Sequence, residues 1–160
     1  MKTKKDIVDD WLPRYTGRPL EDFSKHILLT NFDYYLELFA EKYNAPILGE
    51  DKNMPSVSCD GITMINFGMG SPNAATVLDL LTAIEPEAVF LGKCGGLKTK
   101  HHVGDYVLPI AAIKGEGTSN DYLPQEIPAL PAFSIQKSCS KAITQHGRQY
   151  YTGVIYTTNR

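Results

Sequence analysis

A strand, a glycine loop, a helix and a second strand follow one another between residues 62 and 91, and this order restricts the fold more than any other feature. Residues 62–67 have the pattern of a strand, and glycines then interrupt it before apolar residues return at helical spacing over 73–84. Residues 88–91 form a wholly apolar strand. The segment therefore predicts a β-α-β unit whose two strands are parallel neighbours in one sheet.

Glycine-rich loops follow both strands of this unit. The first is Gly68-Met69-Gly70, and the second is Gly92-Lys93-Cys94-Gly95-Gly96. Ligands of open α/β sheets bind at the carboxyl ends of the strands, and exposed loop amides there can hold an anionic or polyhydroxylated ligand. The alternative for the first loop is a tight turn without a ligand, because a lone Gly-x-Gly is a weak signal and no complete dinucleotide fingerprint follows.

Individual side chains in these loops allow two interpretations each. Lys93 would neutralise a phosphate, or would be an ordinary surface lysine. Cys94 is expected to be a small buried thiol, not a nucleophile, because no motif places a histidine near it. The polar run 118–121 would bind a base or a sugar, or would satisfy backbone groups in a turn. Tyr156, at the end of the last predicted strand, is a candidate for stacking on a nucleobase.

Local signals predict where the other elements begin and end. Asp6 is expected to cap a short helix that Pro13 ends, and Ser71 and Ser134 are expected to cap later helices. Asp60-Gly61 suits a tight hairpin turn. The predicted helices cover 7–12, 33–43, 73–84 and 134–146; the strands cover 26–30, 56–59, 62–67, 88–91, 105–113 and 151–157; and a long loop covers 114–131.

The composition is that of an ordinary globular domain. The 160 residues include 16 Lys and Arg against 18 Asp and Glu, a net charge of -2, and 42% of them are hydrophobic. This balance argues against disorder and against a dedicated nucleic-acid binder. Three cysteines at no metal-ligand spacing predict no metal site. No apolar run is long enough to cross a bilayer, so we predict a soluble, cytoplasmic protein that does not bind membranes.

Five motifs, in their order along the chain, resemble the nucleoside phosphorylase and nucleosidase superfamily. They occupy residues 27–31, 68–74, 92–97, 104–108 and 152–158. Within the superfamily, residues 14–17, Leu97 and the ending 156–160 resemble the AMP nucleosidase branch. The resemblance implies a three-layer α/β/α fold with a mixed, largely parallel central sheet. It also implies a homo-oligomer, typically a hexamer, that hydrolyses AMP to adenine and ribose 5-phosphate; we predict no cofactor.

Two departures from the phosphorylase pattern favour water over phosphate as the nucleophile. Phosphorylases of the superfamily usually have a Gly-Asp-Pro turn after the first strand and an arginine just before the second glycine loop, and both serve the phosphate co-substrate. Thr30-Asn31-Phe32 and Phe90 occupy these places here. A phenyl ring cannot make the bidentate contact of a guanidinium with phosphate.

The resemblance also implies a substrate site. Around the ribose and its attacking water it places Thr30, Asn31, Gly70, Lys93, Cys94, Gly95 and Gly96, with Gly68 and Met69 as further substrate-binding residues. Near the base or the phosphate it places Thr118, Ser119, Asn120 and Asp121, and along the ribose and base it places Tyr156, Thr157 and Thr158. The candidates for the 5′-phosphate are Arg14, Lys93 and Arg160.

The catalytic residues are not identified within these 160 residues. The superfamily's Met-Glu motif, whose glutamate holds the ribose hydroxyls, and its Ser-Asp pair, whose aspartate protonates the purine, have no counterpart and are expected beyond Arg160. We therefore expect residues 1–160 to be one phosphorylase-like domain that is incomplete at its C-terminus. The alternatives are a purine or uridine nucleoside phosphorylase, another nucleosidase, and a non-catalytic nucleotide-binding subunit or fragment.

Overall fold

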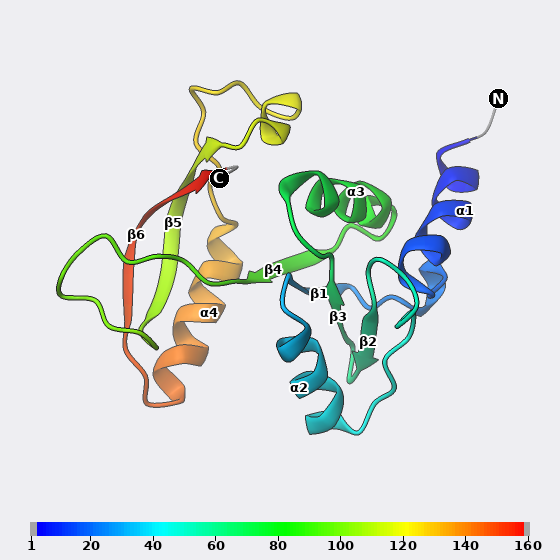
Figure 1. The fold of residues 1–160 in the computed structure, drawn as a ribbon, viewed down its shortest axis with the longest axis horizontal. Coiled ribbons are helices and arrows are strands. Elements are labelled where there is room, and N and C mark those ends of the chain that lie inside the picture. Colours follow the sequence, from blue (N-terminus) through cyan, green and yellow to red (C-terminus); the bar gives the residue numbers. More distant parts are fainter. Residues whose placement is uncertain (1–2, 159–160) are drawn as a thin grey trace. The chain divides into compact units, whose positions relative to one another are not determined.

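The computed structural model describes residues 3–158, which form two compact units that divide after Gly92 (Figure 1). In the first unit the helices are α1 (Lys4–Thr16), α2 (Asp33–Tyr43) and α3 (Ser71–Leu81), with short 3-10 turns η1 (Leu20–Asp22) and η2 (Thr82–Ile84). Its strands are β1 (His26–Thr30), β2 (Ser56–Cys59), β3 (Ile62–Asn66) and β4 (Glu87–Leu91). The second unit contains β5 (Tyr106–Gly115), η3 (Thr118–Asp121), α4 (Phe133–Gln145) and β6 (Tyr150–Thr158).

The sheet of the first unit is mixed and mostly parallel, as predicted. Its order is β2-β3-β1-β4, in which β1 is parallel to β3 and to β4, while β2 is antiparallel to β3. The prediction that the two strands of the β-α-β segment are neighbours is wrong, because β1 lies between them. A parallel strand that is buried on both faces belongs in the middle of a sheet, and β1 carries apolar residues on both.

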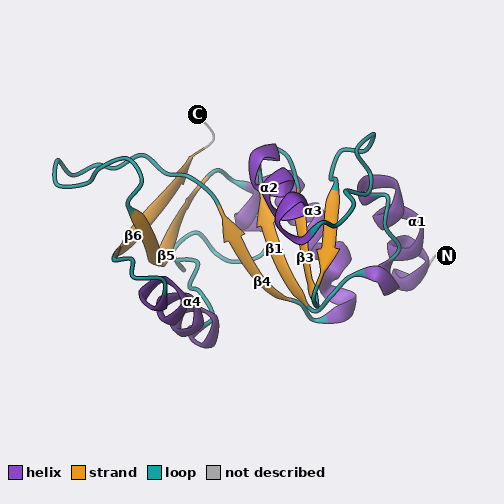
Figure 2. Cartoon of the chain, turned by 90° about the horizontal axis from the view of Figure 1, so that it is seen from below, coloured by secondary structure: helices purple, strands orange, loops and turns teal. Residues whose placement is uncertain are grey.

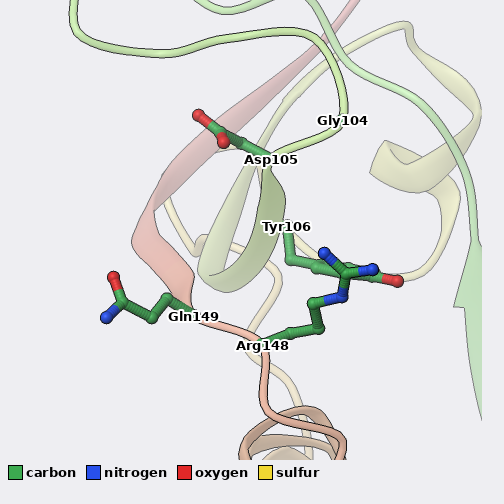
Figure 3. Close-up of a pocket in the computed structure, with 5 residues that line it drawn as sticks. All are labelled: Gly104, Asp105, Tyr106, Arg148 and Gln149. Atoms are coloured by element: carbon green, nitrogen blue, oxygen red, sulfur yellow. The ribbon is translucent and has the colours of Figure 1, made fainter.

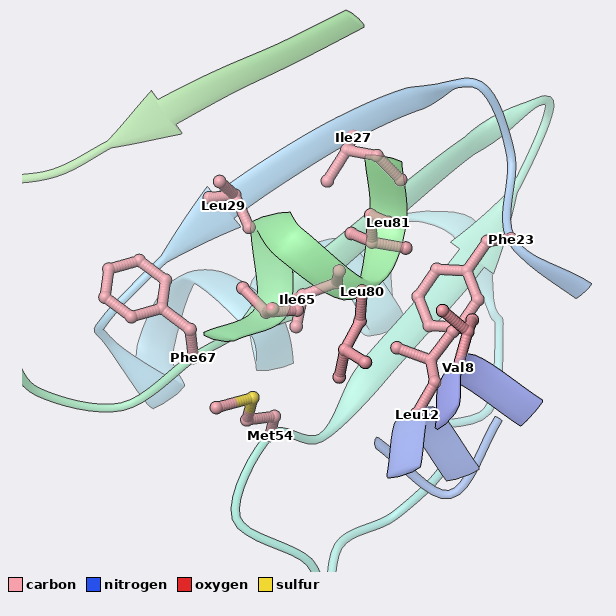
Figure 4. Close-up of a cluster of buried hydrophobic side chains, with 11 residues drawn as sticks. Val8, Leu12, Phe23, Ile27, Leu29, Met54, Ile65, Phe67, Leu80 and Leu81 are labelled. Atoms are coloured by element: carbon pink, nitrogen blue, oxygen red, sulfur yellow. The ribbon is translucent and has the colours of Figure 1, made fainter. Parts of the chain in front are cut away.

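Helices cover both faces of this sheet, which gives the three layers that were expected (Figure 2). One core cluster joins α1 and α3 to alternate residues of β1 and β3, including Ile27, Leu29 and Ile65 (Figure 4). A second cluster joins α2 to the opposite face, where Met64 and Leu28 point. The alternation along each strand thus places successive side chains in different layers.

The N-terminal helix is longer than predicted. Thr3 is its N-cap, and the Thr3 side chain and the Asp6 carboxylate each accept a hydrogen bond from the other residue's backbone N–H. Asp6 therefore lies in the first turn and is not the cap. Pro13 removes one intrahelical hydrogen bond but does not end the helix. The helix ends at Gly17, whose φ of 71° is left-handed.

The hairpin turn is confirmed, but two further predicted caps are wrong. Asp60 and Gly61 both have positive φ, as a tight hairpin requires. Gly70, not Ser71, is the N-cap of α3, and Ala132, not Ser134, is the N-cap of α4; neither cap makes a side-chain hydrogen bond. In both helices the serine lies inside the first turn.

The second unit is built on a parallel pair of strands. β5 pairs with β6, and the register shifts between Pro109 and Ala111, at a proline that cannot donate a ladder hydrogen bond. α4 lies beside β5, where the Gln136 side chain donates to the Pro109 carbonyl. The segment 114–131 is not structureless, because β5 extends to Gly115, η3 follows, and an isolated bridge joins Ala112 to Ala129.

Candidate functional site

The carboxyl end of β1 forms a buried turn. Thr30 is fully buried, its hydroxyl accepts a hydrogen bond from the Phe32 N–H at 3.2 Å, and its carbonyl accepts one from the Phe67 N–H at 3.0 Å. The Asn31 side-chain oxygen is buried and has no hydrogen-bond partner among the described residues. Thr30 therefore holds the ends of β1 and β3 together, and its side chain stabilises the turn that carries Asn31.

A polar pair at the end of β3 was missed by the sequence analysis. Asn66 is almost fully buried; its side-chain amide donates to the Asp33 carboxylate at 2.5 Å, and its side-chain oxygen accepts from the Gly68 N–H at 2.9 Å. Asn66 thus links the start of α2 to the first glycine loop. The signal in the sequence is a polar residue that ends an apolar strand two positions before Gly-x-Gly.

The first glycine loop leads from β3 into the N-terminus of α3. Gly68 and Gly70 have φ of 74° and 97°, a region that residues with a Cβ rarely adopt. Met69 between them is 84% exposed, and its carbonyl accepts a hydrogen bond from the Asn73 side chain at 3.1 Å. The loop presents the positive end of a helix at the carboxyl edge of the sheet, an arrangement that suits an anion.

The second glycine loop begins the second unit, and its residues 93–96 are all exposed. The expectation that Cys94 is buried is wrong, since its thiol is exposed. Residues 92–96 include no bulky apolar side chain that could shield the thiol from solvent. Leu97, which follows them, is itself exposed. Beyond it the chain is anchored by His101, whose ring lies 4.5 Å from that of Tyr151.

The polar segment after β5 has much of its own hydrogen bonding satisfied locally. The Glu116 carboxylate accepts from the backbone N–H groups of Thr118 at 2.9 Å and Ser119 at 3.2 Å, and also from the Ser119 hydroxyl. These contacts match the interpretation in which the segment satisfies backbone groups in a turn. The buried Lys114 ammonium donates to the carbonyls of Leu123 at 2.8 Å and Pro124 at 2.5 Å, which ties the following loop to β5.

Two predicted sets of substrate-binding residues, 118–121 and 156–158, lie at the same, carboxyl-terminal end of the β5–β6 ladder. Gly115 pairs with Thr158 in the register, so residues 118–121 begin close to where residues 156–158 end. Tyr156 is 63% exposed at this end, and Thr157 and Thr158 are also exposed.

The candidates for the 5′-phosphate differ in their surroundings. Arg14 lies on α1 and forms an ion pair with Asp10 at 2.6 Å. Lys93 lies in the exposed second loop, and Arg160 lies outside the described residues. No group of side chains suited to a metal ion occurs within residues 3–158.

A polar hollow of about 280 Å³ lies at the opposite, amino-terminal end of β5 and β6 (Figure 3). It is lined by Gly104, Asp105, Tyr106, Arg148 and Gln149, none of which belongs to the predicted site. A second hollow of about 380 Å³, between the β5–β6 pair and α4, is lined mainly by apolar atoms and also contains no predicted site residue.

Comparisons with known proteins agree with one another. Residues 25–160 match the profile of the phosphorylase superfamily. The crystal structure of AMP nucleosidase from Bacteroides thetaiotaomicron is 62% identical with a TM-score of 0.94, covering 99% of this chain and 70% of that one.

More distant relatives belong to the same superfamily. AMP nucleosidase from Escherichia coli is 27% identical over 79% of this chain, and the chain spans only 34% of that relative's length. Guanosine phosphorylase from Halorubrum lacusprofundi is 32% identical over 62% of this chain and 43% of that relative. The profile match and the 62% identity together place the chain in the phosphorylase superfamily, within the AMP nucleosidase family.

Proposed function

We propose that the protein hydrolyses the N-glycosidic bond of AMP to give adenine and ribose 5-phosphate. The observation that carries the proposal is the 62% identity to an AMP nucleosidase across nearly the whole chain. Such a reaction needs a sugar that can become oxocarbenium-like, a purine that leaves as its protonated form, and a positioned water. We assign binding and orientation to the described residues, and we expect the general acid outside residues 1–160.

The glycine loops supply the groups for the ribose and its phosphate in this proposal. In the first unit, the N-terminus of α3, reached through Gly68 and Gly70, offers a positive end to an anion. In the second unit, the exposed Lys93 carries a full positive charge of its own. Thr30 acts indirectly, because its buried hydroxyl fixes the turn from which Asn31 would contact the ribose.

Phe90 supports water as the nucleophile. Its ring is 57% exposed and lies 5.6 Å from the ring of Phe67, so an apolar surface occupies the place where phosphorylases carry an arginine. Orthophosphate would lose its bidentate partner there and would have to lie against a phenyl group. Water needs no such partner.

We further propose that the protein is a cytoplasmic homo-oligomer, a hexamer in keeping with the family resemblance. Within residues 3–158, every helix is too short or too polar to span a bilayer. The proposed substrate is a small purine nucleotide.

The proposal is tested by incubating the full-length protein with AMP and measuring adenine by chromatography, with and without phosphate. We expect adenine release that does not need phosphate, and that falls in Lys93→Met but not in Lys98→Met, a matched change at an exposed lysine nearby. Cleavage of adenosine that depends on phosphate would instead identify the protein as a phosphorylase. AMP binding measured by calorimetry without adenine release would assign a non-catalytic nucleotide-binding protein.

A further inference from the structure

The ring of Tyr156 lies over the backbone of Gly115. In the β5–β6 register Tyr156 pairs with Ile113, and Gly115 is two residues farther along the same strand, so the two residues share a face of the ladder. A Cβ atom built on Gly115 would lie 2.3 Å from the Tyr156 Oη atom and 2.4 Å from its Cζ atom. Carbon atoms in contact are ordinarily about 3.5–4.0 Å apart, so only a residue without a side chain leaves room for this ring.

The need for glycine at this position is steric. Gly115 is in a regular strand and does not have a positive φ, so alanine could adopt its backbone conformation. Gly115 is the last residue of β5, and a glycine in a strand often marks a place where another group approaches closely; here the phenol is that group. The Thr157 carbonyl oxygen is also close, 2.6 Å from the same Cβ position.

We propose that Gly115 is a positioning residue that holds the Tyr156 ring in one orientation toward the nucleotide. The inference rests on the proposed function, in which Tyr156 contacts the ribose and the base. Because Tyr156 is 63% exposed, little else restrains its ring, and an unrestrained ring would lose rotamer freedom on binding. Gly115 provides a surface against which the ring is ordered before the substrate arrives.

The inference predicts that Gly115→Ala displaces the ring and weakens substrate binding. We expect KM for AMP to rise roughly threefold to tenfold, with kcat changed by less than about twofold, because the ring contributes to binding and not to the chemical step. Gly153→Ala is the matched control: Gly153 is also a strand glycine, and a Cβ there meets no atom within 4 Å. KM should be unchanged in that variant.

A double-mutant cycle separates the ring from the backbone. If Gly115 acts through Tyr156, Gly115→Ala raises KM in the wild type but not in the Tyr156→Ala background. The contact with the Thr157 carbonyl affects both backgrounds equally, and appears as a similar loss of thermal stability in both. An equal rise of KM in both backgrounds would overturn the inference.

Ring position can also be measured without turnover. In full-length protein labelled with 3-fluorotyrosine, the fluorine resonance of Tyr156 is assigned by its loss in Tyr156→Phe. Gly115→Ala should shift this resonance, and Gly153→Ala should not. An unchanged resonance in Gly115→Ala would refute the positioning role even if AMP is hydrolysed. A shifted resonance in a protein that releases no adenine from AMP would leave the steric part standing and refute the proposed function.

Discussion

Among single residues, Lys114 makes a contact whose contribution can be measured directly. Its side chain is buried, and its ammonium donates to two carbonyls of the loop after η3. Lys114→Met keeps the apolar stem but leaves Leu123 and Pro124 without this donor. We expect a loss of about 1–3 kcal/mol in the free energy of unfolding, measured with urea.

Lys141→Met on α4 is the control for this experiment, because Lys141 is an exposed lysine. Its removal should change stability by less than about 0.5 kcal/mol. Equal effects of the two substitutions would show that the contacts of Lys114 with the loop carbonyls do not contribute to stability.

The sequence located the strand ends of the candidate site better than the roles of their side chains. Thr30 does lie at the carboxyl end of β1, but its hydroxyl is used within the turn. Asn66 and Asp33 were missed because their pairing joins residues 33 apart, and no local pattern reports such a contact. Cys94 was expected to be buried on residue type alone, although burial depends on what packs over a loop.

At the scale of the element, periodicity predicted nearly every helix and strand, whereas caps were often wrong. α2 has the predicted limits: its apolar spacing places Leu36 and Phe39 on the buried face, and Asn44, with a left-handed backbone, ends the helix. Ser71 and Ser134 were suitable caps by residue type, yet the backbone places the caps earlier, at Gly70 in α3 and at Ala132 in α4. Pro13 lies in the last turn of α1, and the helix continues past it to Thr16.

The cap of α1 predicts a dependence of stability on pH. Hydrogen bonds from Thr3, first of all from its backbone N–H, hold the pKa of Asp6 below its usual value of 3.8. A carboxyl group whose pKa is lower in the folded state stabilises the fold above its unfolded pKa, and this contribution is lost as the pH falls through the folded pKa. Asp6→Asn should therefore destabilise the protein at pH 7 and have little effect near pH 2.

Thermal unfolding of wild type and Asp6→Asn across this pH range measures the effect. Thr3→Ala, which removes the partner hydroxyl, should cost about 1 kcal/mol at pH 7. Glu41→Gln, at an exposed carboxylate on α2, controls for the loss of one negative charge. A constant difference between wild type and Asp6→Asn from pH 7 to pH 2 would contradict the role of the cap.

At the scale of the whole molecule, the layers were predictable and the strand order was not. Which strands are adjacent depends on how the faces of β1 and β4 are covered, and β4 is only partly buried. The sequence contains the pattern of each strand, but periodicity does not report which strand will be central. The position of β1 between β3 and β4 therefore follows only from the structure.

The distribution of buried side chains predicts unequal stability along the chain. Within residues 3–158, every buried hydrophobic residue lies between Val8 and Leu81, and the one buried residue of the second unit is Lys114. Ile110, Ile113 and Val154 of the β5–β6 ladder are each about half exposed. Local opening requires less free energy where few apolar contacts must be broken.

Hydrogen exchange followed by mass spectrometry should therefore rank the strands of this chain. We expect amides of β1 and β3 to exchange most slowly, and those of β5 and β6 at least roughly 100-fold faster. Parallel strands are normally covered on both faces, whereas α4 packs on only one side of the β5–β6 pair. Slow exchange in β5 and β6 would therefore require further protein to pack on the other face. Equal protection of the two sheets in the chain of residues 1–160 would contradict the prediction and would mean that the exposed face of the ladder is buried in solution.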